Sequence, residues 1–219
     1  MRGSAPKSVT LFTIVGLLVF LGLLAELWRH FLPSPLAEAW APLFSLSFEG
    51  NVPTWYSSCL LFWCGLILIE IAGGIRKRRA AYGRHWTFLG IGFFYMSLDE
   101  AIGIHESLGG ITGSGGILYY DWIVPAAVLL LILALFYWPF LGSLRPDLRR
   151  RFLLAATLYV GGAVGMELPL GYWVTRFGDD GFGYAGLDLV EEALELVGAT
   201  LFLTTLIGEL RSGREGGLA

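Results

Sequence analysis

Six long apolar stretches constrain the fold more than any other feature of this sequence. They cover residues 9–28, 54–75, 86–107, 121–142, 151–174 and 187–209. Each approaches the roughly 20 residues that an α-helix needs to cross a hydrocarbon core of about 30 Å. The sequence therefore predicts one all-α integral membrane domain over residues 1–219, built as a bundle of six transmembrane helices.

The composition supports this prediction. Hydrophobic residues make up 55% of the chain and charged residues only 15%, whereas soluble domains carry about 25% charged residues. The excess apolar surface must therefore face the lipid bilayer. The net charge of −3 and the lack of a basic array exclude nucleic acid as an expected partner. Cys59 and Cys64 lie on one predicted helix and cannot bridge each other, so we expect two free, buried thiols.

The basic residues predict the orientation of the bundle. Most of them fall in two loops on the same side, at residues 76–84 and 145–151. The loops on the opposite side carry only Arg29 and Arg176. By the positive-inside rule, both termini are expected to be cytoplasmic in a multi-pass protein of the cell inner (plasma) membrane.

Ionisable residues inside three of the predicted helices are the main candidates for function. One Asp at the centre of a membrane helix costs about 2.5–3.5 kcal/mol on insertion scales, so such residues are seldom carried without a role. The candidates lie in the third, fifth and sixth helices: Asp99, Glu100, His105 and Glu106; Glu167; and Glu191, Glu192 and Glu195.

Their depths in the membrane agree. At about 1.5 Å of rise per residue, Asp99 lies roughly 20 Å above the inner surface, Glu167 about 22 Å and Glu195 roughly 18 Å. Asp99 and Glu106, seven residues apart, are also expected to share a helix face. The sequence thus predicts one carboxylate cluster in the outer half of the bilayer.

Such a cluster needs either a bound cation or bound protons, because like charges in an apolar setting repel one another. As metal ligands we single out Asp99, His105, Glu106, Glu167, Glu192 and Glu195, with Glu191 and Glu100 secondary. A carboxylate-rich site with at most one His favours Mn, Fe or Ca over Zn or Cu.

Simpler structural roles compete with this interpretation. Asp188 and Glu191 fit a capping box at the start of the sixth helix, while His105 and Glu106 fit headgroup water. Glu26 and Asp121 are expected at the membrane interface. Gly161 and Gly165 predict a close helix contact, and Pro169 predicts a kink beside Glu167.

The acidic pattern Leu98-Asp99-Glu100-x4-His105-Glu106, then Glu167, then Glu191-Glu192-x2-Glu195-x2-Gly198 resembles that of a group of uncharacterised bacterial six-helix membrane proteins. The resemblance covers residues 86–209. It implies that these residues act as a set, but it implies no particular reaction.

Three functions are compatible with the sequence. The leading one is a membrane protein whose carboxylate cluster binds a cation or exchanges protons. The second is a non-catalytic accessory subunit of a larger membrane complex, since size and helix count are similar to those of small respiratory or photosynthetic subunits. The third is a small transporter, disfavoured because no inverted repeat is evident. No nucleophile elbow, P-loop or dinucleotide motif indicates an enzyme class.

Overall fold

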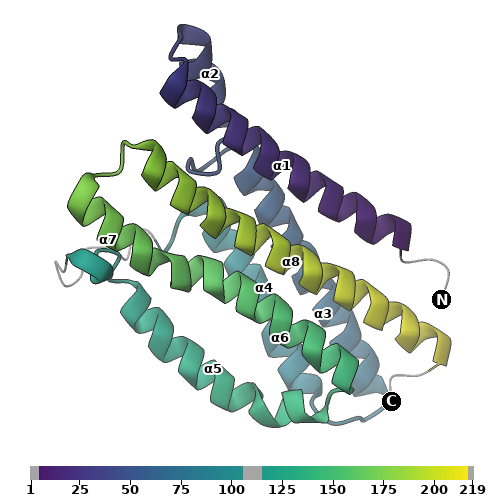
Figure 1. Cartoon of the computed structure of the whole chain (residues 1–219). Coiled ribbons are helices and arrows are strands. Elements are labelled where there is room, and N and C mark those ends of the chain that lie inside the picture. The colour runs from purple at the N-terminus through teal and green to yellow at the C-terminus, as the bar shows by residue number, and fades with distance from the viewer. Residues whose placement is uncertain (1–4, 106–114, 217–219) are drawn as a thin grey trace.

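The computed structural model describes residues 5–105 and 115–216, with side chains described from residue 8 to residue 212 outside that gap. Every regular element in these residues is a helix (Figure 1). In chain order they are α1 (Ala5–Phe31), α2 (Pro35–Phe44), α3 (Val52–Lys77), α4 (Gly83–Ile102), η2 (Gly116–Leu118), α5 (Ile123–Ser143), α6 (Pro146–Val160), η3 (Gly161–Met166), α7 (Glu167–Phe177) and α8 (Phe182–Gly216). The all-α class is confirmed.

Five helical segments are long and apolar enough to cross a membrane. They are Ser8–Phe31, Val52–Lys77, Ile123–Ser143, Pro146–Phe177 and Phe182–Ser212. The sixth expected span corresponds to α4, which is not among the five. Its 20 residues include Arg84 and His85 at one end and Asp99 and Glu100 at the other, which lowers its apolar character.

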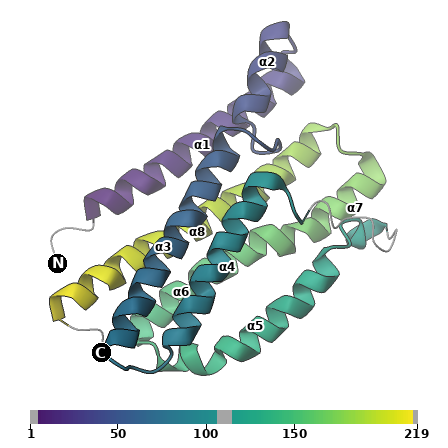
Figure 2. The same ribbon diagram turned by 180° about the vertical axis from the view of Figure 1, so that it is seen from behind.

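Helix α8 is the centre of the bundle. It packs against α1, α3, α6, α7 and η3, and it lies between α1 and α6 in Figure 1. Turned by 180°, the bundle shows α3 and α4 as an antiparallel pair on its other side (Figure 2). The start of α1, the end of α8, and the α3–α4 and α5–α6 turns all lie at one end of the bundle (Figures 1 and 2).

Small residues allow α3 and α4 to pack closely. A Cβ atom on Gly65 would lie 3.2 Å from the Gly90 carbonyl oxygen, and one on Gly90 would lie 3.3 Å from the Gly65 oxygen. Nearer the other end, Ser58 donates to the Ser97 carbonyl at 2.8 Å, and Ser97 returns a bond to the Ser58 carbonyl at 2.9 Å. Such small residues and interhelical hydrogen bonds are typical of helix pairs in membranes.

A second close contact joins α8 to the α6–η3 segment. A Cβ atom on Gly162 would lie 2.7 Å from the Glu191 carbonyl oxygen, and one on Gly198 would lie 2.7 Å from the Tyr159 nitrogen. The predicted contact through Gly161 and Gly165 is wrong, because Gly161 faces open space and Gly165 approaches only its own helix. Gly162, the residue after Gly161, makes the contact with α8 instead.

The distortion expected near Pro169 takes the form of a π-helical turn, η3, between α6 and α7. Pro169 has no N–H, so it cannot bond to the carbonyl four residues earlier, within η3. A π turn shifts the hydrogen-bond register by one residue and is often found beside functional sites. It leaves Glu167 at the first position of α7.

Several predicted boundaries are wrong in an informative way. Helix α4 ends at Ile102 rather than 107, because Gly103 adopts a left-handed conformation with φ of 61°. Helix α8 begins at Phe182 rather than 187, so Asp188 and Glu191 lie inside the helix and form no capping box. The expected loop after α1 contains α2, whose first turn is capped by Ser34.

Helices α1 and α2 are joined through Glu26. Its side chain is 2% exposed and accepts a hydrogen bond from the Ser45 hydroxyl. Arg29 and His30 on the same helix lie 3.5 Å and 3.2 Å from its carboxylate. Asp121, at the start of the α5 segment, is likewise 2% exposed; the interfacial depth expected for both residues stays a prediction.

Candidate functional site

The predicted acidic residues lie toward the end of the bundle opposite the basic turns. Asp99 and Glu100 are near the end of α4, Glu167 begins α7, and the α8 carboxyls fall in the first half of that helix. We refer to Glu100, Glu167, Glu191, Glu192 and Glu195 as the carboxyl cluster. Among the described residues, those near the α3–α4 and α5–α6 turns supply most of the basic charge, at the far end (Figure 1).

Glu195 is buried at the contact between α8 and the α6–η3 segment. Its side chain is 8% exposed and packs on Gly162, where a Cβ atom would lie 2.8 Å from the Glu195 Cγ. Its carboxyl group is hydrogen-bonded to the Tyr159 hydroxyl. The glycine contact between α8 and the α6–η3 segment therefore brings a buried carboxyl and a phenol together.

Carboxyls from α4 and α8 share this environment. Among the neighbouring charges, those of Glu195 and Glu100 act most strongly on Glu192, and Glu100 also acts on Glu195. The Ser57 hydroxyl on α3 hydrogen-bonds to Glu100, and Glu49 lies within electrostatic range of it. Two helices far apart in sequence thus place carboxyls within electrostatic range of one another.

Glu167 and Glu191 extend the carboxyl cluster toward α5. Glu191 is 8% exposed and Glu167 7% exposed, and the charge of Glu167 acts on Glu191. The Trp122 indole donates to the Glu167 carboxylate, with 2.9 Å between Nε1 and Oε1. Trp122 is thus a hydrogen-bond donor within the site.

Asp99 has a different role from the one expected. Its carboxylate accepts bonds from the backbone N–H of His105 and faces the His105 ring nitrogen Nδ1, both at 2.8 Å. It therefore fastens the turn that ends α4. His105 in turn lies 4.9 Å from the Trp122 ring, between centroids. Asp99, His105, Trp122 and Glu167 form a continuous chain of contacts.

Glu106 lies outside the described residues. Because α4 ends at Ile102, the helix face that Asp99 and Glu106 were expected to share does not extend to residue 106. In residues 5–105 and 115–216, no three His, Cys, Asp or Glu side chains are grouped so that they could hold one metal ion. The metal-ligand role of Asp99, His105, Glu167, Glu192 and Glu195 stays a prediction, as do the secondary roles of Glu100 and Glu191. Both cysteines are free, as expected, but only Cys64 is buried, whereas Cys59 is partly exposed.

Two tyrosine hydroxyls are hydrogen-bonded to each other near the start of α8. The hydroxyls of Tyr120 and Tyr184 lie 3.1 Å apart. Burial raises the pKa of Tyr120, in the turn before α5, to about 12. This phenol therefore stays protonated at neutral pH and can donate or accept a hydrogen bond.

Sequence reasoning missed Tyr159, Trp122 and Glu49. Tyr159 precedes Gly162 by three residues, as Glu195 precedes Gly198, so each side chain lies on the same helix face as a glycine. That paired spacing is the signal that could have identified Tyr159. Glu49 lies in an irregular segment, so helix periodicity cannot predict the direction of its side chain.

Comparison with known proteins gives one match. The model of a family described as "Domain of unknown function (DUF8692)" matches residues 9–209. No curated protein and no solved structure matches the chain. The matched range contains every residue of the carboxyl cluster.

Proposed function

We propose that this chain, which belongs to the DUF8692 family, is a multi-pass membrane protein whose carboxyl cluster binds and exchanges protons. Five carboxyls in one apolar bundle would repel one another strongly if all were ionised. Ionisable groups inside a membrane bundle mark proton or ion pathways by default. The observation that carries the proposal is that buried Glu195 of α8 lies within electrostatic range of Glu100 of α4 and Glu167 of α7.

The hydrogen-bond donors at the site favour protons over a metal ion. Glu195 meets the phenol of Tyr159, and Glu167 meets the indole of Trp122. Neutral O–H and N–H donors satisfy a carboxyl oxygen while leaving its proton free to exchange. A cation bound among the same oxygens, with Mn, Fe or Ca as candidates, is the other form of the proposal.

Infrared difference spectroscopy of the purified protein at several pH values tests the proposal. Protonated carboxyls give a C=O stretch that carboxylates lack. We expect such a band at neutral pH, lost in part in Glu195→Gln and unchanged in Glu38→Gln, an exposed carboxyl on α2. Loss of the same signal in both variants, or no such band at all, contradicts proton binding. Stoichiometric metal that is lost in Glu195→Gln supports the cation form.

An accessory-subunit role is the second candidate, and α5 favours it. This helix is anchored near its ends, where Trp122 bonds to Glu167 and the Phe136 ring stacks 4.5 Å from the His85 ring. Between these anchors its side chains are largely exposed, among them Leu131 at 62% and Leu135 at 69%. A partner helix could cover this surface as well as lipid. Purification in mild detergent that always retains a second membrane protein would support this role.

A further inference from the structure

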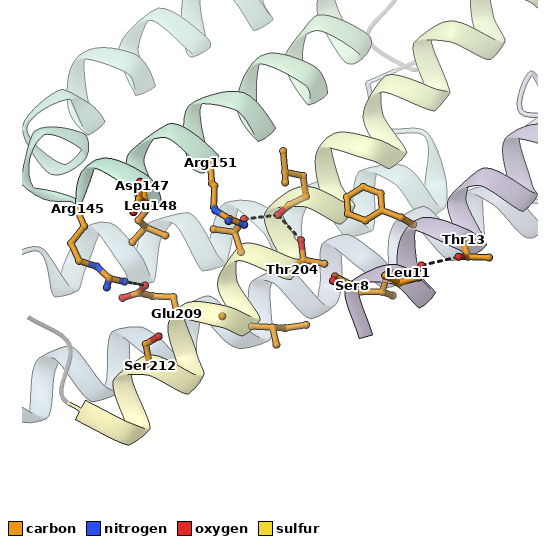
Figure 3. Close-up of a pocket in the computed structure, with 16 residues that line it drawn as sticks. Ser8, Leu11, Thr13, Arg145, Asp147, Leu148, Arg151, Thr204, Glu209 and Ser212 are labelled. Carbon is orange, nitrogen blue, oxygen red and sulfur yellow. Dashed lines mark hydrogen bonds and ion pairs between the residues drawn. The ribbon is translucent and has the colours of Figure 1, made fainter. Parts of the chain in front are cut away.

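A cavity lies at the basic end of the bundle, away from the carboxyl cluster. It has a volume of about 850 Å³ and is lined by residues of α1, α6 and α8 (Figure 3). This volume falls in the range of about 300–1,000 Å³ that is typical of small-molecule sites. A Cβ atom on Gly208, one of the lining residues on α8, would meet nothing within 4 Å. The α8 wall is therefore open at this point.

The charged part of the lining is balanced. Arg145 and Arg151 contribute two positive charges, while Asp147 and Glu209 contribute two negative ones. Arg145 donates to the Glu209 carboxylate at 2.5 Å, and its side chain remains 58% exposed. A guanidinium has five N–H donors, so Arg145 can bind a further acceptor without leaving Glu209.

The rest of the lining is uncharged and combines apolar side chains with the hydroxyls of Ser8, Thr13, Thr204, Thr205 and Ser212. Its apolar part includes Val9, Leu11 and Phe12 on α1 and Leu201 and Ile207 on α8. Figure 3 shows Arg145 and Glu209 at one end of the cavity, and Leu11 with Ser8 and Thr13 of α1 at the other. A charge-balanced end and an uncharged end with apolar side chains match a molecule with a charged headgroup and a hydrocarbon tail.

We propose that this cavity binds a phospholipid whose headgroup carries both a phosphate and an ammonium group. The arginines receive the phosphate and the exposed carboxylate of Asp147 receives the ammonium, while an acyl chain lies between α1 and α8. A headgroup that carries only a negative charge would give the cavity a net negative charge, because the charges of the lining residues already cancel. The proposal rests on the membrane assignment made above, but it is independent of proton binding by the carboxyl cluster.

The test uses the full chain in nanodiscs of equal parts phosphatidylethanolamine and phosphatidylglycerol, with lipids that remain bound counted by native mass spectrometry. We expect retained phosphatidylethanolamine in excess over phosphatidylglycerol. Gly208→Leu fills the cavity and should lower retention about fivefold or more. Gly16→Leu, a matched substitution on α1 outside the lining with equally open surroundings, should leave it unchanged.

A charge variant tests the headgroup assignment separately. Glu209→Gln leaves one positive charge in excess, so retention should shift toward phosphatidylglycerol, while Glu38→Gln should cause no shift. Equal retention of the two lipids by the unmodified chain, or unchanged retention in Gly208→Leu, overturns the proposal. Displacement of lipid by millimolar soluble phosphoethanolamine would identify the headgroup alone as the ligand and overturn the phospholipid assignment. Infrared results on Glu195→Gln bear on neither outcome.

Discussion

Tyr159 is the residue on which the hydrogen bonding of Glu195 most directly depends. Tyr159→Phe removes the phenol O–H and leaves the buried carboxyl without this partner, which should lower the free energy of unfolding by about 1–3 kcal/mol. Thermal unfolding in detergent measures the change. Tyr95→Phe is the matched control, since Tyr95 is 52% exposed on α4, and it should be nearly neutral. Equal effects of the two substitutions would show that the Tyr159 hydroxyl contributes nothing specific.

Glu26 is the residue on which the attachment of α2 to α1 most directly depends. Glu26→Ala leaves Ser45, Arg29 and His30 without their shared carboxylate, and breaking a buried charged pair typically costs about 3–5 kcal/mol. We expect faster amide hydrogen exchange across Pro35–Phe44 than in the unmodified protein. Glu38→Ala, at an exposed site on α2 itself, should leave exchange unchanged. Unaltered exchange in Glu26→Ala would mean that α2 is held by other contacts.

At the scale of elements, the contact between α6 and α8 depends on Gly198. In Gly198→Ala the new Cβ would lie 2.7 Å from the Tyr159 backbone nitrogen, so the two helices must separate, at a cost of about 1–3 kcal/mol. Gly16→Ala meets open space and should stabilise α1 by up to about 1 kcal/mol, because Ala favours helix over Gly. Thermal unfolding of both variants measures this difference. Equal stability of the two would contradict the close contact.

The sequence predicted the long helices well because apolar length is a strong signal. It missed α2, whose 10 residues include Pro35 and Pro42, because a short helix between prolines has no such signal. The sequence prediction also extended α4 past Gly103, because the sequence does not show that a glycine within an apolar run adopts a left-handed conformation. Only the bonds from His105 to Asp99 show why the chain turns there.

The site was predictable only in part. Rise per residue placed carboxyls of different helices at one level, and the structure has Asp99 and Glu100, Glu167 and the three α8 glutamates toward the same end of the bundle. The predicted direction of the Asp99 side chain is wrong, because Asp99 bonds to His105 in the turn that follows its own helix. A carboxylate near a helix end has such local partners, and helix periodicity does not take them into account. The contacts of Trp122 and Tyr159 depend on tertiary packing through Gly162 and Gly198, which one sequence does not reveal.

For the whole molecule, the proposed topology makes α4 a sixth span and places both termini in the cytoplasm. Single cysteines introduced at exposed positions test it in a background lacking Cys59 and Cys64. Gly115→Cys and Asp179→Cys should react with a membrane-impermeant reagent in intact cells. Ala80→Cys, in the α3–α4 turn, should react only after permeabilisation. Labelling of positions 80 and 115 from the same side would contradict a membrane-spanning α4.

The most direct test of the carboxyl cluster is a double-mutant cycle of Glu100→Gln and Glu195→Gln, read as the free energy of unfolding in detergent. Because the two carboxyls share one environment, their effects should be non-additive by at least about 0.5 kcal/mol. The control cycle of Glu38→Gln with Glu195→Gln should be additive within about 0.3–0.5 kcal/mol. Additivity of Glu100→Gln and Glu195→Gln to the same degree would contradict a common cluster.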